Sequence, residues 1–168
     1  MKKIILFLFL LVISMIWTRN KKEWFIPNES LRFRIIANSN SLEDQLEKYD
    51  LRTKLLPILN KVGNNADTYE TTKANIQSEL STIEKIVNDT TENYNISFGK
   101  NFFPAKNYNS IQYNAGEYES LVITLGEGMG ENWWCVLFPP LCLLEAEKEQ
   151  LSDLQYDYYL RKIINQFF

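Results

Sequence analysis

Three glutamates in the C-terminal half are the residues whose type could do chemistry: Glu117, Glu119 and Glu127. Glycoside cleavage requires a pair of carboxyl groups, one acting as acid and the other as base or nucleophile. On one face of a strand, Glu117 and Glu119 would lie about 6.5 to 7 Å apart. Both carboxylates would then stand on one surface rather than on either side of a substrate. We therefore favour a strand entry whose glutamates pair with Arg32 and Arg34, or face water, over a catalytic pair.

The composition excludes much of the remaining chemistry. The chain has no histidine and two cysteines, so Ser-His-Asp and Cys-His catalysis, His-ligated zinc and four-cysteine zinc sites are unavailable. Gly126, Gly128 and Gly130 have the alternating spacing of a phosphate loop. They join two predicted strands and open no helix, so the helix N-terminus that would hold phosphate is missing. We expect a flexible hairpin connection there, and a protein without a catalytic site, metal or cofactor.

The two cysteines and two tryptophans lie close together in the sequence. In an oxidising exterior Cys135 and Cys142 could pair around the Pro-Pro step, or they could remain two buried thiols, and their spacing does not decide between these. Trp133 and Trp134 are adjacent, so in a strand they point to opposite faces. One indole is then expected near the surface, either as a contact for a partner or covered by a later segment. We take the pair, with Arg32, Arg34 and Asn38, as the candidate recognition surface.

Alternating residues indicate the strands that would carry these side chains. Leu121, Ile123 and Leu125 share one face of residues 117–125, and residues 133–138 read as a second strand running back beside it. Residues 31–37 form the first strand of the domain, with the arginines on its outward face. Further short strands are expected near residues 96–102 and 111.

Two helices are expected between the first strand and the later ones. Ser41 caps a helix over residues 42–62, which Pro57 must kink or split, and a second helix follows Thr68. The core side of the first helix is predicted to be Leu46, Tyr49, Leu55, Leu56, Leu59 and Val62, and that of the second Ile76, Leu80, Ile83 and Val87. The order predicts an α+β fold, with a largely antiparallel sheet of about four strands and two helices packed on one face.

The two ends of the chain differ from the middle. Lys2 and Lys3 precede fourteen uncharged, largely apolar residues, which is the layout of an export signal over residues 1–17. It is too short for an ordinary membrane span but lacks a small-residue cleavage site, so cleavage and retention as an anchor both stay open. Residues 18–30 read as a tether. Residues 145–168 read as a polar spacer and an amphipathic helix whose apolar side could dock on the domain, on the membrane surface through residues 156–168, or on a partner helix.

The charge of the remaining chain argues against nucleic acid as a partner. Without Lys2 and Lys3 there are 16 basic and 21 acidic residues, a formal charge of −5. A phosphate backbone is bound by clustered basic side chains, and no basic patch is evident. We therefore expect an exported acidic domain that does not bind nucleic acid.

Two stretches of the chain resemble the signatures of a known family. The runs AGEYES, LVITLGEG and NWWCVLFPPLC, with LRFRIIANSNSLEDQ at residues 31–45, are similar to the stage II sporulation protein R family of endospore-forming bacteria. Asn114 and Leu42 stand where prolines are expected, and Met129 and Glu131 interrupt the glycine run. These differences affect local rigidity rather than the fold.

The resemblance implies a function that the residues alone do not. Members are exported into the space between the two membranes of the sporangium, where they activate a membrane-embedded aspartic protease. That protease matures the pro-form of the mother-cell sigma factor. The resemblance thus implies that residues 31–144 form a signalling domain that acts as a ligand and not as an enzyme. The alternative is a domain that binds or hydrolyses the cell wall.

Overall fold

The chain is described by a computed structural model that covers residues 4, 24–25, 29–108, 111–142, 144 and 153–167. Apart from Ile4, the predicted leader lies outside the described residues, as do most of the tether and residues 145–152 of the spacer. None of the helices formed by the described part is long and apolar enough to cross a membrane. The chain divides into two compact units, residues 1–27 with 104–116 and residues 28–103 with 117–168.

The described residues of the smaller unit form three short strands: β1 (Trp24–Phe25), β4 (Lys106–Tyr108) and β5 (Ile111–Tyr113). They form a sheet in the order β1-β5-β4, with β1 parallel and β4 antiparallel to β5. Part of the predicted tether therefore forms a strand, and residues 104–116 belong to this smaller unit.

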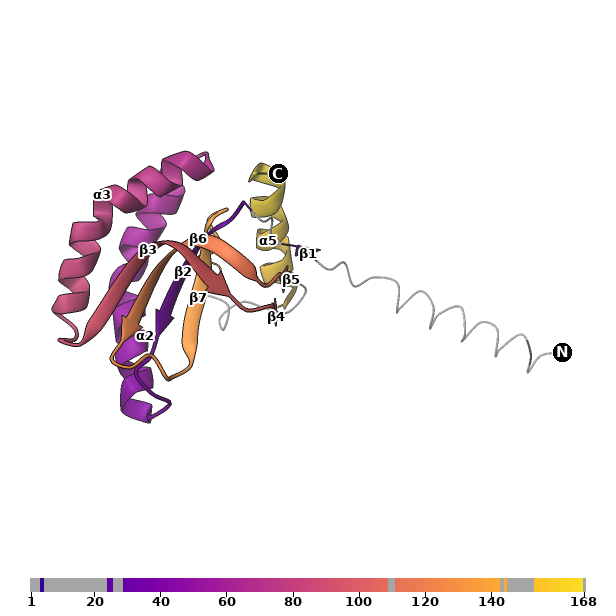
Figure 1. Ribbon diagram of the computed structural model, residues 1–168. Coiled ribbons are helices and arrows are strands. Elements are labelled where there is room, and N and C mark those ends of the chain that lie inside the picture. Colours follow the sequence, from indigo (N-terminus) through magenta and orange to yellow (C-terminus); the bar gives the residue numbers. More distant parts are fainter. Residues whose placement is uncertain are drawn as a thin grey trace. The chain divides into compact units, whose positions relative to one another are not determined.

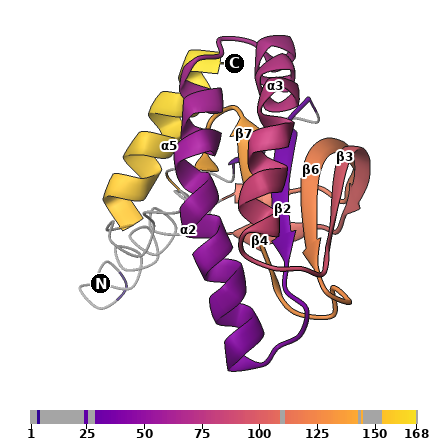
Figure 2. The ribbon, with the colours of Figure 1, turned by 90° about the vertical axis from the view of Figure 1, so that its left-hand side faces the viewer.

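The larger unit is an α+β layer structure, as predicted (Figure 1). Its sheet has the order β3-β6-β2-β7, formed by β3 (Tyr94–Phe103), β6 (Gly116–Leu125), β2 (Leu31–Ile36) and β7 (Asn132–Phe138). Helices α2 (Leu42–Asn64) and α3 (Tyr69–Asn88) lie on one face of this sheet (Figure 2). Helix α5 (Asp153–Phe167) follows the sheet in sequence.

The neighbours of the strands differ from the expectation. Strands β6 and β7 were expected to pair as a hairpin, but β2 lies between them. Strand β2 runs parallel to β6, with Phe33 opposite Leu121, and antiparallel to β7, with Phe33 opposite Cys135. The predicted pairing was wrong because an alternating pattern of apolar residues identifies a strand but does not determine which strand it pairs with. As one of the two inner strands, β2 is covered by backbone on both edges.

The main core lies between the helices and one face of the sheet. It contains Phe33 and Ile35 of β2, the three predicted apolar residues of β6, and the buried stripe Ile76, Ile83 and Val87 of α3. Thr68 caps α3 through a reciprocal bond pair with Thr71. The start and core face of α3 are therefore as predicted, because caps and helical periodicity are both local signals.

Helix α2 departs from the prediction in its core face. It continues through Pro57 to Asn64, so Pro57 does not split it. Its core stripe is Leu51, Leu55, Leu59 and Val62, whereas Leu46 and Tyr49, predicted to face the core, are exposed. The helix carries two apolar stripes at helical spacing, and spacing alone does not say which one is buried.

Candidate partner-binding surface

The structure separates the residues that sequence reasoning grouped as a recognition surface. Arg32, Arg34 and Trp134 lie on the face of the sheet opposite α2 and α3, because they alternate with the core residues of β2 and β7. Trp133 points to the helix side. Asn38 lies in the turn before α2, and the two glutamates lie at the start of β6.

Arg32 was expected on the outward face, and it is fully buried instead. Its guanidinium carbon lies 3.3 Å from the ring centroid of Tyr118 and 5.3 Å from that of Phe103, within the range of cation–π attraction. Its Nε donates to Ser30 Oγ at 3.2 Å. Arg32 does lie on the face of β2 opposite the core residues, as predicted, but aromatic rings pack on that face as well. Arg32 is therefore structural and offers no free surface to a partner.

Arg34 and Trp134 form the more accessible part of the same face. They are opposite each other in the register of β2 and β7, and both are partly buried. The guanidinium of Arg34 lies 4.6 Å from the Phe103 ring centroid, and Trp134 lies 5.3 Å from the same ring. Burial lowers the pKa of Arg34, although guanidinium groups keep their proton in proteins. This partly buried cation beside aromatic rings is suited to a carboxylate or carbonyl of a partner.

Trp133 is packed on the other side of the sheet, so the two indoles face opposite sides as predicted. Its ring makes an edge contact with Phe33, with centroids 6.0 Å apart. The guanidinium of Arg52 lies 5.4 Å from the Trp133 ring and 5.4 Å from the Tyr49 ring. Arg52 was not singled out from the sequence, because nothing in the local pattern of α2 indicates that it bridges a helix to a strand.

Asn38 acts as a clamp between the turn that precedes α2 and the glycine run. Its Nδ2 donates to Asp44 Oδ2 at 3.1 Å, and its Oδ1 accepts from the backbone N–H of Glu127 at 2.9 Å. The hydrogen bonds from Ser39, Ser41 and Asn38 lower the pKa of Asp44, with Ser39 making the largest contribution. Asn38 therefore holds two loops together rather than facing a partner.

The glycine run is anchored, and not the flexible hairpin connection that was expected. The backbone N–H groups of Met129 and Gly130 donate to the carbonyls of Asn38 and Ala37, each at 2.9 Å. A Cβ on Gly130 would lie 2.2 Å from the Ser39 carbonyl oxygen, and Gly126 adopts a φ of +52°. The glycines are needed because the connection passes close over the end of β2.

The two candidate glutamates of β6 have different environments. Glu119 forms a salt bridge with Lys73 of α3 at 2.8 Å, which raises the pKa of Lys73. Glu117 is exposed. Glu127 follows the other end of β6, roughly 30 Å from Glu117 at a rise of about 3.3 Å per residue. A pair of carboxylates acting on one glycosidic bond must be closer than about 10 Å. Glu117 and Glu127 therefore do not form such a pair.

Cys135 and Cys142 are joined by a disulfide, with Cα atoms 4.9 Å apart. Both residues are buried, and the bridge spans the Pro139-Pro140 step. Gly63 of α2 lies against this step, since a Cβ there would lie 2.9 Å from Pro140 Cβ. The disulfide and the proline pair thus hold the end of β7 against the end of α2.

Helix α5 packs on the core of its own unit, one of the three alternatives left open by the sequence. Leu160 and Ile164 are buried, and the ring of Phe167 lies 5.4 Å from that of Phe138. Tyr159 is exposed and lies against Tyr158. The side chains of Tyr156 and Phe168 lie outside what the structure describes.

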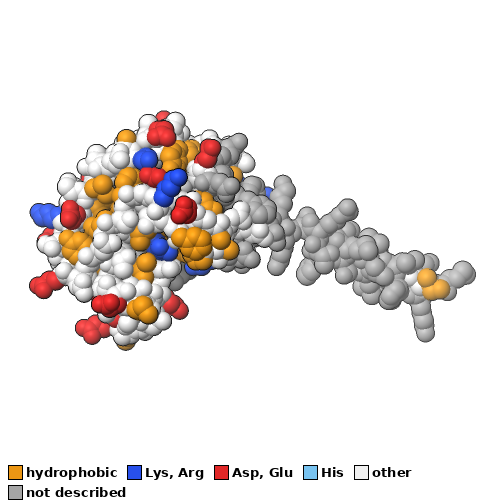
Figure 3. Space-filling model, in the orientation of Figure 1, with side chains coloured by type: hydrophobic (Ala, Val, Ile, Leu, Met, Phe, Trp, Pro, Cys, Tyr) orange, Lys and Arg blue, Asp and Glu red, His pale blue; other side chains and the backbone are white. Residues whose placement is uncertain are grey.

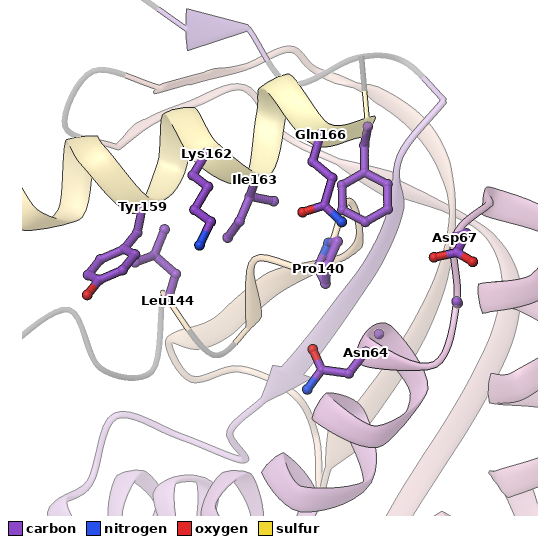
Figure 4. A pocket seen from close by; sticks show the side chains of 11 residues that line it. Asn64, Asp67, Pro140, Leu144, Tyr159, Lys162, Ile163 and Gln166 are labelled. Atoms are coloured by element: carbon purple, nitrogen blue, oxygen red, sulfur yellow. The ribbon is translucent and has the colours of Figure 1, made fainter.

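A cavity of about 490 Å³ separates α5 from the end of α2 (Figure 4). Lys162, Gln166 and Ile163 of α5 line one wall, and Asn64 and Asp67 line the other. Pro140 lies between the walls in the close-up. Its lining is mixed, and it shows no group of three or more potential metal ligands among the described residues.

Comparisons with known proteins agree with this layout. Residues 27–148 match the family model described as Stage II sporulation protein R (spore_II_R). The chain is 41% identical over 136 residues to the stage II sporulation protein R of Bacillus subtilis (strain 168). The aligned region covers 74% of this chain and 61% of the relative. The chain therefore spans about three fifths of the length of that relative. No solved structure matches. On these matches, the chain belongs to the stage II sporulation protein R family.

Proposed function

We propose that this protein is an exported sporulation signal that activates a membrane-embedded aspartic protease, which then processes the pro-form of the mother-cell sigma factor. Family membership over residues 27–148 supports a role in sporulation and is the observation that carries the proposal. The protease, its substrate and the export are what the family resemblance implies. The basic and apolar layout of residues 1–17 also supports export.

The proposed mode of action is binding and not catalysis. Of the carboxylates considered for hydrolysis, Glu119 is paired with Lys73 and Glu127 is separated from Glu117 by the length of β6. A ligand can activate a protease if it binds the active arrangement more tightly than the inactive one, because only differential affinity shifts a population. The partly buried Arg34 and Trp134, and the exposed end of α2, are surfaces that could supply such affinity. Contact between residues 156–168 and the membrane surface belongs to the same proposal.

Co-expression tests the function directly. The full chain is produced with the candidate protease and the pro-sigma substrate from the same organism, and cleavage of the substrate is followed by immunoblot. Cleavage that requires both the chain and the protease supports the proposal. Cleavage that is absent with all three proteins present, or that occurs without this chain, would overturn it. Release of fragments from purified cell wall by the chain alone would instead support the wall-hydrolase alternative.

A further inference from the structure

Helix α2 presents an apolar row that the fold does not use. Leu42, Leu46 and Tyr49 are 77%, 59% and 45% exposed, and their spacing of four and three residues places them on one face of the helix. The core stripe that begins at Leu51 lies on another face. Large apolar side chains that recur at helical spacing and stay uncovered mark interaction sites more often than isolated ones do. We call Leu42, Leu46 and Tyr49 the exposed row.

The exposed row is held rigidly at one end of the larger unit. The first turns of α2 reach past the end of the sheet (Figure 2). Ser41 caps the helix by accepting from the Asp44 N–H at 3.2 Å, and Lys48 Nζ donates to the Glu131 carbonyl at 3.0 Å. Arg52 lies between Tyr49 and Trp133, as described above. A surface ordered in advance loses little entropy when a partner binds.

The charge beside Leu42 and Leu46 is acidic, whereas the Tyr49 ring also lies within reach of Lys48 and Arg52. Glu43, Glu47 and Asp50 follow Leu42, Leu46 and Tyr49 by one residue each, so they form a parallel row on the helix. Asp50 is paired with Lys54 at 2.7 Å. Residues 42–54 and 126–131 together carry six carboxylates and three basic side chains. Acidic side chains surround hydrophobic ones at the end of the unit where α2 begins, at the lower left of Figure 3.

We propose that the exposed row binds a segment of the partner protein that carries apolar side chains next to lysine or arginine. The inference rests on the proposed function and names the chemistry of the surface that meets the protease. Electrostatic complementarity favours a basic segment at an acidic rim. A second copy of this chain would bring two acidic rows together, because a two-fold interface contacts itself. The acidic row would also repel anionic lipid headgroups, because both carry negative charge.

Single charges placed in the row test the proposal in the co-expression assay. Leu46→Glu and Leu42→Glu should lower cleavage of the pro-sigma substrate about tenfold or more, as expected for a residue at the centre of an interface. Glutamate in the first turn suits the helix dipole, so Leu42→Glu should keep the fold intact. Phe102→Glu is the matched control, since Phe102 of β3 is 61% exposed and lies outside the row. With Phe102→Glu, cleavage of the pro-sigma substrate should stay within about twofold of the cleavage seen with the unmodified chain.

The charge of the rim is tested separately. Glu43→Lys with Glu47→Lys should reduce cleavage, whereas Glu84→Lys on α3, at a position as exposed as that of Glu43, should not. The secreted level and the melting temperature of each variant are compared with those of the unmodified chain. Normal cleavage by folded Leu46→Glu and Leu42→Glu would overturn the inference and leave the proposed function standing. No cleavage by the unmodified chain would overturn both.

Two other occupants of the exposed row, a second copy of the chain and a membrane surface, would also give clear results. Sedimentation of the unmodified chain as a dimer that Leu46→Glu dissociates would show that the row binds a second copy. Co-sedimentation with phosphatidylglycerol vesicles that Leu42→Glu abolishes would show a membrane surface. Either result would overturn the proposed basic protein segment, whereas a monomer that does not bind vesicles agrees with it.

Discussion

The guanidinium carbon of Arg32 lies 3.3 Å from the centre of the Tyr118 ring, inside the larger unit. Both side chains are buried, and both project from the face of the sheet that α2 and α3 do not cover. A buried cation is costly unless its surroundings replace the water that it loses. The aromatic rings and Ser30 provide part of that replacement. This face therefore has a packed cluster of its own.

Replacing Arg32 should destabilise the protein without affecting a binding surface directly. We expect Arg32→Ala to lower the free energy of unfolding by about 2 to 4 kcal/mol, through a cavity and lost cation–π contacts. The measurement is urea unfolding followed by tryptophan fluorescence. Lys100→Ala, at an exposed position of β3, is the control and should change stability by less than about 0.5 kcal/mol. Equal stability of the two variants would contradict the structural role of Arg32.

Removing the Asn38 clamp should loosen the glycine run. Asn38→Ala loses the acceptor for the Glu127 N–H and the donor to Asp44. We expect a loss of about 1 to 2 kcal/mol, because one part-buried and one exposed hydrogen bond are lost. Amide hydrogen exchange should accelerate at Glu127 and Met129 but not in α3. Asn95→Ala, at an exposed site in β3, is the control. Unchanged exchange at Glu127 would show that Asn38 is not the clamp.

Asp44 should make stability depend on pH at the acidic end. Its pKa is lowered from 3.8 in the folded state, so the unfolded state binds a proton first as the pH falls. The contribution of Asp44 is fully present above its unfolded pKa and is lost as the pH falls through the lower folded pKa. Asp44→Asn should therefore flatten the acid limb of a plot of melting temperature against pH. An acid limb as steep as that of the unmodified chain would show that other carboxylates dominate.

Reduction of the disulfide should destabilise the end of β7. A bridge between Cys135 and Cys142 closes a short loop, for which chain entropy predicts about 2 kcal/mol of stabilisation. Urea unfolding should shift to lower concentration when a reducing agent is added. The double variant Cys135→Ala and Cys142→Ala should be insensitive to reductant. Unfolding curves that coincide with and without reductant would show that the bridge does not stabilise the protein.

Local signals in the sequence predicted local features of the structure. Ser41 and Thr68 were identified as helix starts because capping depends on residues three positions away. The core stripe of α3 and the opposite orientation of Trp133 and Trp134 follow from helix and strand periods. The α+β class followed from the order of such elements.

Features that depend on distant residues were not predictable in the same way. The burial of Arg32 depends on Tyr118 and Phe103, which only the folded sheet brings beside it. The exposure of Leu46 depends on which of two apolar stripes the sheet selects. The role of Arg52 depends on Trp133, a residue in a strand far along the chain. The folded structure places the predicted recognition residues in different environments, and these environments show which of the residues remain accessible to a partner.

The position of β2 between β6 and β7 has a consequence for the order in which the protein folds. Arg32 pairs with Ser120 on one edge and with Val136 on the other, so both ladders of the strand join segments roughly ninety to a hundred residues apart. A ribosome synthesises β2 before either partner strand. The first strand of this sheet to be made therefore completes its ladders only when the last one has been made, and a chain that stops before Asn132 leaves β2 open on one edge.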